Sequence, residues 1–145
     1  MKWKAEFFFI LPLKHNPMSE KSKYSIEFTI QSSPQLLFQY LSTPSGLSEW
    51  FADNVNSRGE EFTFIWDDSE ETAKLLSKKA NEIVRFQWDD DEGEDYYFEF
   101  FIQVDDITKD VSLIVTDFTT EDEMEESRML WDNSIADLKQ ILGST

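Results

Sequence analysis

The stretch 24-YSIEFTIQSSPQLLFQYLSTPSGLSEWF-51 contains the signals of three structural elements in a row. Its first eight residues alternate apolar and polar side chains, which is typical of a strand with one buried face. Ser33–Pro34 and Thr43–Pro44 then each place a capping residue before a proline, which is the usual start of a helix. We therefore predict a strand followed by two short helices that meet at residues 42–44.

The second short helix carries three large apolar side chains on one face, because Leu47, Trp50 and Phe51 are spaced i, i+3, i+4. Two interpretations account for them. In one, they pack the helix onto the rim of a sheet. In the other, Trp50 and Phe51 line the entrance of a ligand cavity. The pattern favours packing for Leu47 and leaves both interpretations open for the two aromatic residues.

Beyond Gly59 the chain has the pattern of consecutive strands. Alternation is clear in EFTFIW (61–66), EIVRFQW (82–88), YYFEFFIQV (96–104) and VSLIVTDF (111–118), and weaker in TAKLLSK (72–78). The connections are short and rich in acidic and turn residues, which suits hairpins, and Gly93 is expected to supply a positive φ. Arg85 alternates with inward residues, so it should face water and pair with acids. The sequence predicts an antiparallel meander with one dry face.

The last segment, residues 121–145, has the pattern of the longest helix. Acidic residues crowd its start, where the helix dipole favours negative charge, and Gly143 is placed to end it. Its apolar stripe consists of Met124, Trp131, Ile135, Leu138 and Leu142. A strand, two short helices, a run of strands and a long helix together predict an α+β fold, with helices on one face of an antiparallel sheet.

Composition excludes several classes of function. The 145 residues fit one domain, and the net charge of −17 repels nucleic acid and anionic membrane surfaces. The absence of cysteine excludes disulfides and thiolate chemistry, and it suits a cytoplasmic protein. His15 is the one histidine, so a Ser-His-Asp triad and imidazole-based zinc sites lack their parts. We expect no cofactor and no resident metal.

The first segment, MKWKAEFFFILPLKHNP, resembles a signal peptide only superficially. Its apolar run is short, Pro12 interrupts it, and no small-residue cleavage site follows. It is also too short to span a bilayer, so we expect no membrane insertion. We interpret residues 1–17 as an N-terminal extension outside the core fold, and residues 18–145 as the folded domain.

Two motifs carry a resemblance to a known family. LSTPSGLSEWF (41–51) follows the first strand and MLWDNSIADLKQIL (129–142) ends the chain. Together with the strand ending in Phe86 and Trp88, they resemble the helix-grip fold of START-like domains and the birch-pollen-allergen superfamily. The similarity is greatest to the branch named after activators of the ninety-kilodalton heat-shock chaperone's ATPase. It spans about residues 23–142, although this chain has few of the family's glycines and is far more acidic.

The resemblance implies a curved sheet that grips the C-terminal helix, with a cavity between them for a small apolar or aromatic, lipid-like ligand. The residues predicted to line it are Trp50, Phe51, Phe64, Trp66, Phe86, Trp88, Tyr96, Phe98, Phe100, Trp131, Ile135 and Leu138. The competing interpretation is that these side chains fill the interior as ordinary core. The preferred function is a non-enzymatic ligand-binding domain.

Two other functions stay open. One is a protein-interaction module, such as a co-chaperone-like regulator, whose acidic surface attracts a basic partner. The other is an enzyme of the cyclase or dehydratase kind, with Asp53 or Asp117 transferring a proton and Tyr96 as donor. For both carboxylates the simpler expectation is an exposed, solvated side chain. The acidic run 89–95 lacks the ligand spacing of a calcium-binding loop, so we interpret it as a solvated turn.

Overall fold

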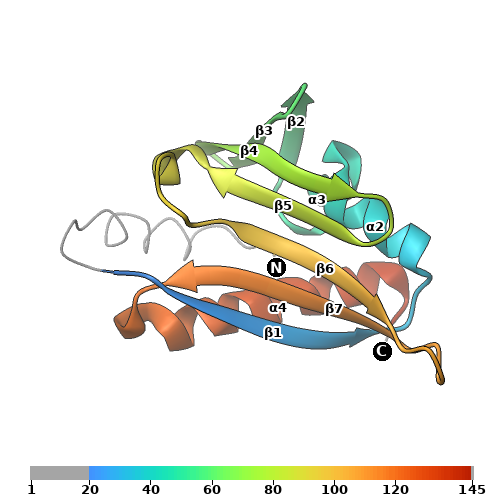
Figure 1. Cartoon of the computed structure of the whole chain (residues 1–145). Helices are drawn as coiled ribbons and strands as arrows, with labels where there is room; N and C mark the ends of the chain where they lie inside the picture. Colours follow the sequence, from blue (N-terminus) through green and yellow to red (C-terminus); the bar gives the residue numbers. More distant parts are fainter. Residues whose placement is uncertain (1–19, 145) are drawn as a thin grey trace.

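The computed structural model describes residues 20–144. It confirms the α+β prediction: one antiparallel sheet bends around helices on its inner face (Figure 1). The strands are β1 (Ser22–Ile30), β2 (Asn54–Arg58), β3 (Glu61–Trp66), β4 (Ser69–Lys79), β5 (Ile83–Trp88), β6 (Phe98–Val104) and β7 (Val111–Thr119). The helices are α2 (Pro34–Ser42), α3 (Pro44–Trp50) and α4 (Met124–Leu142), with short 3₁₀ turns η1 (Asp89–Asp91) and η2 (Glu121–Glu123). Residues 1–17, predicted to be an extension, lie outside the described residues.

The sheet has the strand order β1-β7-β6-β5-β4-β3-β2. Strands β3 to β7 form the predicted meander, β2 extends it at one edge, and β1 pairs antiparallel with β7 at the other. A register shift between Leu75 and Ser77 interrupts the β4–β5 pairing, and such irregularities bend a sheet. Strand β2 was not predicted. Only Val55 of its five residues is buried, so the segment shows no apolar alternation from which a strand could be predicted.

The caps of the two short helices are the predicted ones. Ser33 Oγ accepts a hydrogen bond from the Leu36 amide at 3.2 Å, and Thr43 Oγ1 accepts one from the Gly46 amide at 3.0 Å. Gly46 allows the helices to approach, because a Cβ at this position would lie 2.2 Å from the carbonyl oxygen of Gln39. A tight turn at Thr43 therefore folds α3 back onto α2.

The long helix α4 begins one turn later than predicted. Residues 121–123 form the 3₁₀ turn η2, and Glu123 has φ −107° and ψ 4°, outside the α-helical region. The helix ends as predicted at Gly143, whose φ is +75°. Gly93 likewise has the expected positive φ, at +89°. Figure 1 shows α4 running alongside β1 and β7, with α2 near the ends of β5 and β6 and α3 close to β2.

The sheet has the predicted dry and wet faces, with one error of placement. Inward residues of the central strands, such as Phe86, Phe100 and Val115, are fully buried. Tyr96 was expected to point inward with Phe98, which is wrong. Tyr96 lies before β6 begins, and its ring packs on Phe118 on the outer face, 5.4 Å between centroids. The strict alternation of the strand does not extend to its N-terminal flank.

Candidate functional site

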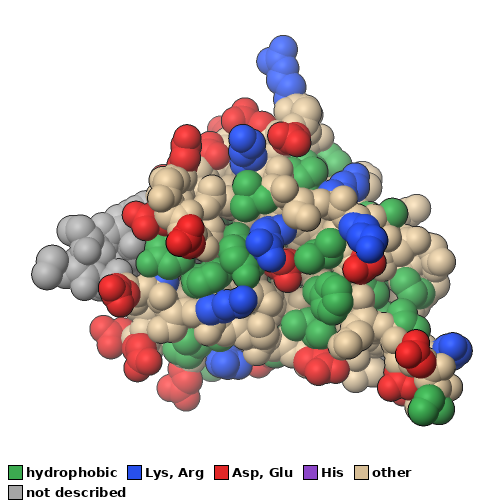
Figure 2. Space-filling model, viewed as in Figure 1, with side chains coloured by type: hydrophobic (Ala, Val, Ile, Leu, Met, Phe, Trp, Pro, Cys, Tyr) green, Lys and Arg blue, Asp and Glu red, His purple; other side chains and the backbone are tan. Residues whose placement is uncertain are grey.

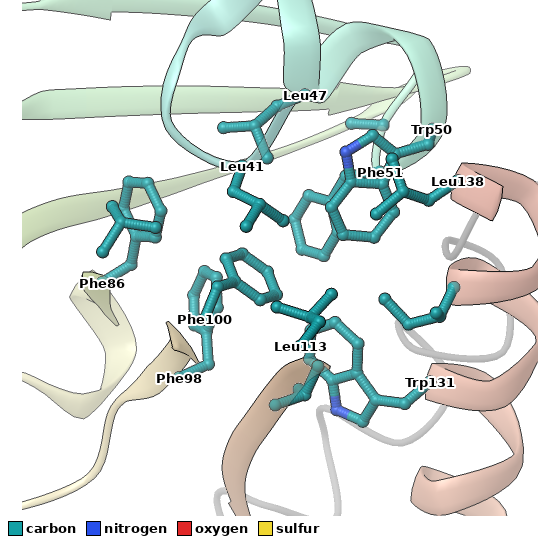
Figure 3. Close-up of a cluster of buried hydrophobic side chains, with 14 of the residues drawn as sticks. Leu41, Leu47, Trp50, Phe51, Phe86, Phe98, Phe100, Leu113, Trp131 and Leu138 are labelled. Carbon is teal, nitrogen blue, oxygen red and sulfur yellow. The ribbon is translucent and has the colours of Figure 1, made fainter. Parts of the chain in front are cut away.

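Several aromatic side chains meet between the sheet and the helices, and we call nine of them the aromatic cluster. They are Trp50, Phe51, Phe64, Trp66, Phe86, Trp88, Phe98, Phe100 and Trp131. Their neighbouring rings lie 4.9–6.4 Å apart between centroids. The close-up in Figure 3 shows Phe51, Phe98, Phe100 and Trp131 converging from α3, the sheet and α4. The cluster thus connects the sheet, the short helix α3 and the long helix α4, which are the elements predicted to surround the interior of a helix-grip fold.

Phe51 lies at the centre of the aromatic cluster. Its ring stacks on Trp131 at 6.0 Å and on Phe98 at 5.9 Å, and it meets Phe64 edge-on at 5.2 Å. Phe51 is the C-cap of α3, so one residue at the end of a short helix touches both the sheet and α4. A ligand entering here has to lie beside these rings or separate them.

The indole N–H groups of the cluster donate to specific acceptors. Trp50 Nε1 donates to the Tyr40 carbonyl at 2.8 Å, and Trp66 Nε1 to the Phe51 carbonyl at 3.0 Å. These bonds fix α3 against α2 and against β3. Trp131 Nε1 donates to a side chain instead, the Oδ2 of Asp117, at 3.0 Å.

Several buried polar side chains lie beside the aromatic cluster, where β7 leads into α4, and we call five of them the polar end. They are Tyr24, Asp117, Thr119, Glu123 and Ser127. Tyr24 and Asp117 are register partners across β1 and β7, and the Tyr24 hydroxyl hydrogen-bonds to Ser127 Oγ on α4. Asp117 Oδ1 also accepts from the Phe118 amide at 2.8 Å. The three elements β1, β7 and α4 thus share one polar network.

Burial and the negative charge of Asp117 raise the pKa of Tyr24 above its ordinary value of 10.0. The phenol is therefore held in its neutral form, which can donate a hydrogen bond. The guanidinium of Arg128, 5.1 Å from the Tyr24 ring centroid, acts in the opposite direction but is a weaker influence. Ionisation of Tyr24, which would add a negative charge beside Asp117, is consequently disfavoured.

Of the twelve predicted cavity residues, the structure brings eleven together in the interior. Nine form the aromatic cluster, and Ile135 and Leu138 of α4 pack against it. Tyr96 is excluded, as described above. The expectation that Asp117 is a solvated side chain is wrong, since it is 5% exposed and bonded to Trp131. Asp53 is exposed, and its Oδ2 accepts from the Asp67 amide at 2.8 Å.

Sequence reasoning did not identify Tyr24, Thr119, Glu123 and Ser127 as site residues. The strand alternation alone places Tyr24 on the dry face, so its inward position was predicted but its hydroxyl partner was not. The i, i+4 spacing of Glu123 and Ser127, continued by Trp131, was the available signal for a polar extension of the α4 stripe. Acidic residues at a helix start are usually exposed, so this spacing was not interpreted as a buried site.

The outer face of the sheet has a different character. Arg85 pairs with Glu99 at 2.6 Å, as predicted, and its guanidinium lies 3.9 Å from the Tyr97 ring centroid. Figure 2 shows Lys and Arg side chains interspersed with hydrophobic ones in the middle of one face of the molecule, with acidic side chains around them. A surface groove of about 540 Å³ is lined mainly by charged residues, including Arg58, Glu61 and Lys74.

Within residues 20–144 there is no group of three or more His, Cys, Asp or Glu side chains placed to hold a metal ion. No helix in the same range has the length and apolar character needed to cross a membrane.

The geometry described above is that of a helix-grip domain with an aromatic interior, and the comparisons agree. The family model for START-like superfamily domains matches residues 18–144, so the chain belongs to the START-like superfamily. This confirms the resemblance inferred from the two motifs. No protein with a curated description matches the chain.

Solved structures with the same fold include BfR322 from Bacteroides fragilis, which is 35% identical. The match covers 86% of this chain and 92% of that one, with a TM-score of 0.63. The Aha1 dimer from Colwellia psychrerythraea is 18% identical over 83% of this chain and 96% of its own, with a TM-score of 0.71. CalU16 from Micromonospora echinospora is 15% identical over 86% and 76%, with a TM-score of 0.64. At such identities the last two share the fold alone.

Proposed function

We propose that this domain binds a small apolar or aromatic compound between the sheet and α4, without converting it chemically. The observation that carries the proposal is the junction of the aromatic cluster with the polar end inside one interior. Trp131 connects the two, because its ring stacks on Phe51 while its indole N–H bonds to Asp117. Natural ligand sites combine apolar walls with a few convergent polar groups in this way.

The proposal includes no reaction, because the groups considered for catalysis do not meet. A proton transfer that uses both Asp117 and Tyr96 requires them on one face of the sheet, whereas Asp117 points inward and Tyr96 packs on the outer face. Asp53 is exposed beside the β3–β4 turn. We also propose a cytoplasmic location. The chain contains no cysteine and hence no disulfide, which suits a reducing compartment.

The test uses the full chain and a panel of fatty acids and small aromatic compounds, monitored by native mass spectrometry and by ¹H–¹⁵N NMR. We expect at least one compound to shift the indole signals of Trp88 and Trp131. The backbone amides of Phe101 and Ile114, which carry outer-face side chains, serve as the control and should not move. The proposal is overturned if no compound of the panel shifts the interior signals. This comparison uses only concentrations at which the outer-face signals stay unchanged.

A second candidate function is a protein-interaction module, and one observation favours it. Ile83, Phe101 and Ile114 are register neighbours on the outer face, and they leave part of their apolar surface exposed. In this alternative, the net charge of −17 attracts a partner with a basic surface. A pull-down from lysate at low and high salt tests it. Capture that is lost in a Phe101→Ser variant supports the interaction, and failure to capture at low salt opposes it.

A further inference from the structure

The polar end contains two buried carboxylates, Asp117 and Glu123, each 5% exposed. A carboxylate removed from water is unfavourable unless donors or a cation compensate it. Asp117 accepts hydrogen bonds from Trp131 Nε1 and the Phe118 amide. Glu123 Oε1 accepts from Thr120 Oγ1 at 3.1 Å.

Two atoms of the polar end have no hydrogen-bond partner among the described residues. They are Glu123 Oε2 and Thr119 Oγ1, and Thr119 is only 1% exposed. Buried polar atoms without a partner are rare in folded proteins, so each one needs a cause. A ligand group that donates hydrogen bonds to both atoms would supply that cause.

The chain geometry places these atoms at the same end of the interior. Thr119 is the inward residue of β7 after Asp117. Glu123 is the residue immediately before α4, and it is buried like Ser127 four residues further on. The chain reverses direction between them at Thr120 and η2. Their oxygens therefore belong to the corner where β7 turns into α4, beside the Tyr24–Ser127 pair.

The electrostatics of this corner favour a positive ligand group. Two carboxylates and a neutral phenol face it, and Arg128, an exposed residue of α4, places its guanidinium 5.1 Å from the ring centroid of that phenol. An ammonium group offers three donors and one positive charge, which matches a carboxylate oxygen and a hydroxyl that lack partners. A carboxylate ligand would add a third negative charge and no donor.

The aromatic cluster also favours a ligand that carries a positive charge. Trp131 is bonded to Asp117 and stacked on Phe51, so a body attached to an ammonium at the polar end would lie against aromatic rings. Indole and phenyl faces attract cations as well as apolar groups. The polar end would thus bind the ammonium group of such a ligand, and the adjoining aromatic cluster would bind its apolar body.

We propose that the ligand is an organic cation: a primary amine on a small apolar or aromatic body, with its ammonium at Glu123, Thr119 and Asp117. This inference rests on the proposed function, because it specifies the class of compound that the interior binds. It also predicts that fatty acids and aromatic acids of equal size bind less well than the amine.

Three probes with one phenylethyl body separate the headgroup from the body: 2-phenylethylamine, 2-phenylethanol and 3-phenylpropionate. The full chain is titrated with each, and the dissociation constant is taken from the Trp131 indole shift. We expect the amine to bind at least about tenfold more tightly than the alcohol, since one charge-assisted hydrogen bond is sufficient for that ratio. We expect the propionate to bind most weakly.

A matched pair of variants distinguishes the buried carboxylate from the general acidity of the chain. Glu123→Gln removes the buried charge, and Glu121→Gln removes an exposed one two residues away. Amine affinity should fall about tenfold in the first variant and stay unchanged in the second, while alcohol affinity stays constant in both. Circular dichroism checks the fold, and Asp117→Asn, with the same expected loss, replaces Glu123→Gln if that variant does not fold.

The outcomes separate the two proposals. Equal binding of all three probes would overturn the cation inference and leave the proposed function standing. Amine binding that is equally weakened by both variants would show diffuse surface attraction, and tightest binding of the propionate would show the opposite charge preference. Either result overturns the inference. If no probe and no compound of the wider panel perturbs the interior, the proposed function fails as well.

Discussion

The indole of Trp131 on α4 donates its N–H to the Asp117 carboxylate on β7 at 3.0 Å, in the interior of the domain. This bond links the long helix to the strand that precedes it, and it connects the aromatic cluster to the polar end. A Trp–Asp pair at this depth requires both groups to be present, because either one alone would leave a buried polar group without that partner.

Replacing Trp131 with phenylalanine should therefore destabilise the domain. The substitution removes the donor to Asp117 while keeping an aromatic ring, and we expect a loss of about 2–4 kcal/mol, from the lost bond and the smaller ring together. Urea unfolding followed by circular dichroism measures it. The control is Asp132→Asn at the adjacent exposed position, which should change stability by less than about 0.5 kcal/mol. Equal stability of the two variants would contradict the assigned role of the bond.

Phe51→Ala tests the centre of the aromatic cluster. Phe51 is fully buried and contacts rings from the sheet and α4, so its truncation should cost about 3–5 kcal/mol. Ile107→Ala removes an apolar side chain that is 91% exposed and should have almost no effect. Thermal and urea unfolding compare them. A small loss at Phe51 would mean that the ring already borders open space.

Gly46→Ala separates close packing from backbone strain. An alanine Cβ would lie 2.2 Å from the Gln39 carbonyl oxygen, so α2 and α3 must move apart. Gly59→Ala meets no atom within 4 Å but requires a φ of +63°, which costs about 1–2 kcal/mol. We expect the Gly46 variant to be the less stable of the two in urea unfolding. The reverse order would show that the interhelical contact is less tight than the structure indicates.

The raised pKa of Tyr24 predicts a loss of stability at high pH. Because the folded state holds the phenol neutral above its ordinary pKa of 10.0, the unfolded chain releases this proton first as pH rises. The contribution of Tyr24 is thus complete below about pH 10 and declines above it. Urea unfolding between pH 8 and pH 11 measures the decline. Tyr24→Phe should make it shallower, whereas Tyr97→Phe, on the outer face, should leave it unchanged.

Residues 18–145 should fold without the segment that precedes them, as the sequence analysis proposes. A chain that begins at Met18 is expected to give the same circular dichroism spectrum as the full chain and a melting temperature within a few degrees of it. A large loss of stability on truncation would show that residues 1–17 belong to the folded unit.

The sequence was sufficient to predict the order and type of most elements. Alternation in residues 24–31 and 61–66 identified strands, and Ser33–Pro34 and Thr43–Pro44 identified the starts of α2 and α3. These signals are local, because side-chain periodicity and capping depend on residues within a turn of each other. The inward set of large aromatic side chains followed from the same periodicity, except at Tyr96.

Tertiary structure alone decided how β2 pairs, where Tyr96 points and what surrounds Asp117. Residues 54–58 carry little apolar pattern, and they form a strand because the edge of β3 offers hydrogen-bond partners. Aspartate is a residue type that is usually exposed, but the position of Asp117 in β7 is one whose side chain points inward. It is buried because Trp131, fourteen residues away, supplies a donor. Such pairings depend on residues brought together by the fold, and no local pattern in the chain encodes them.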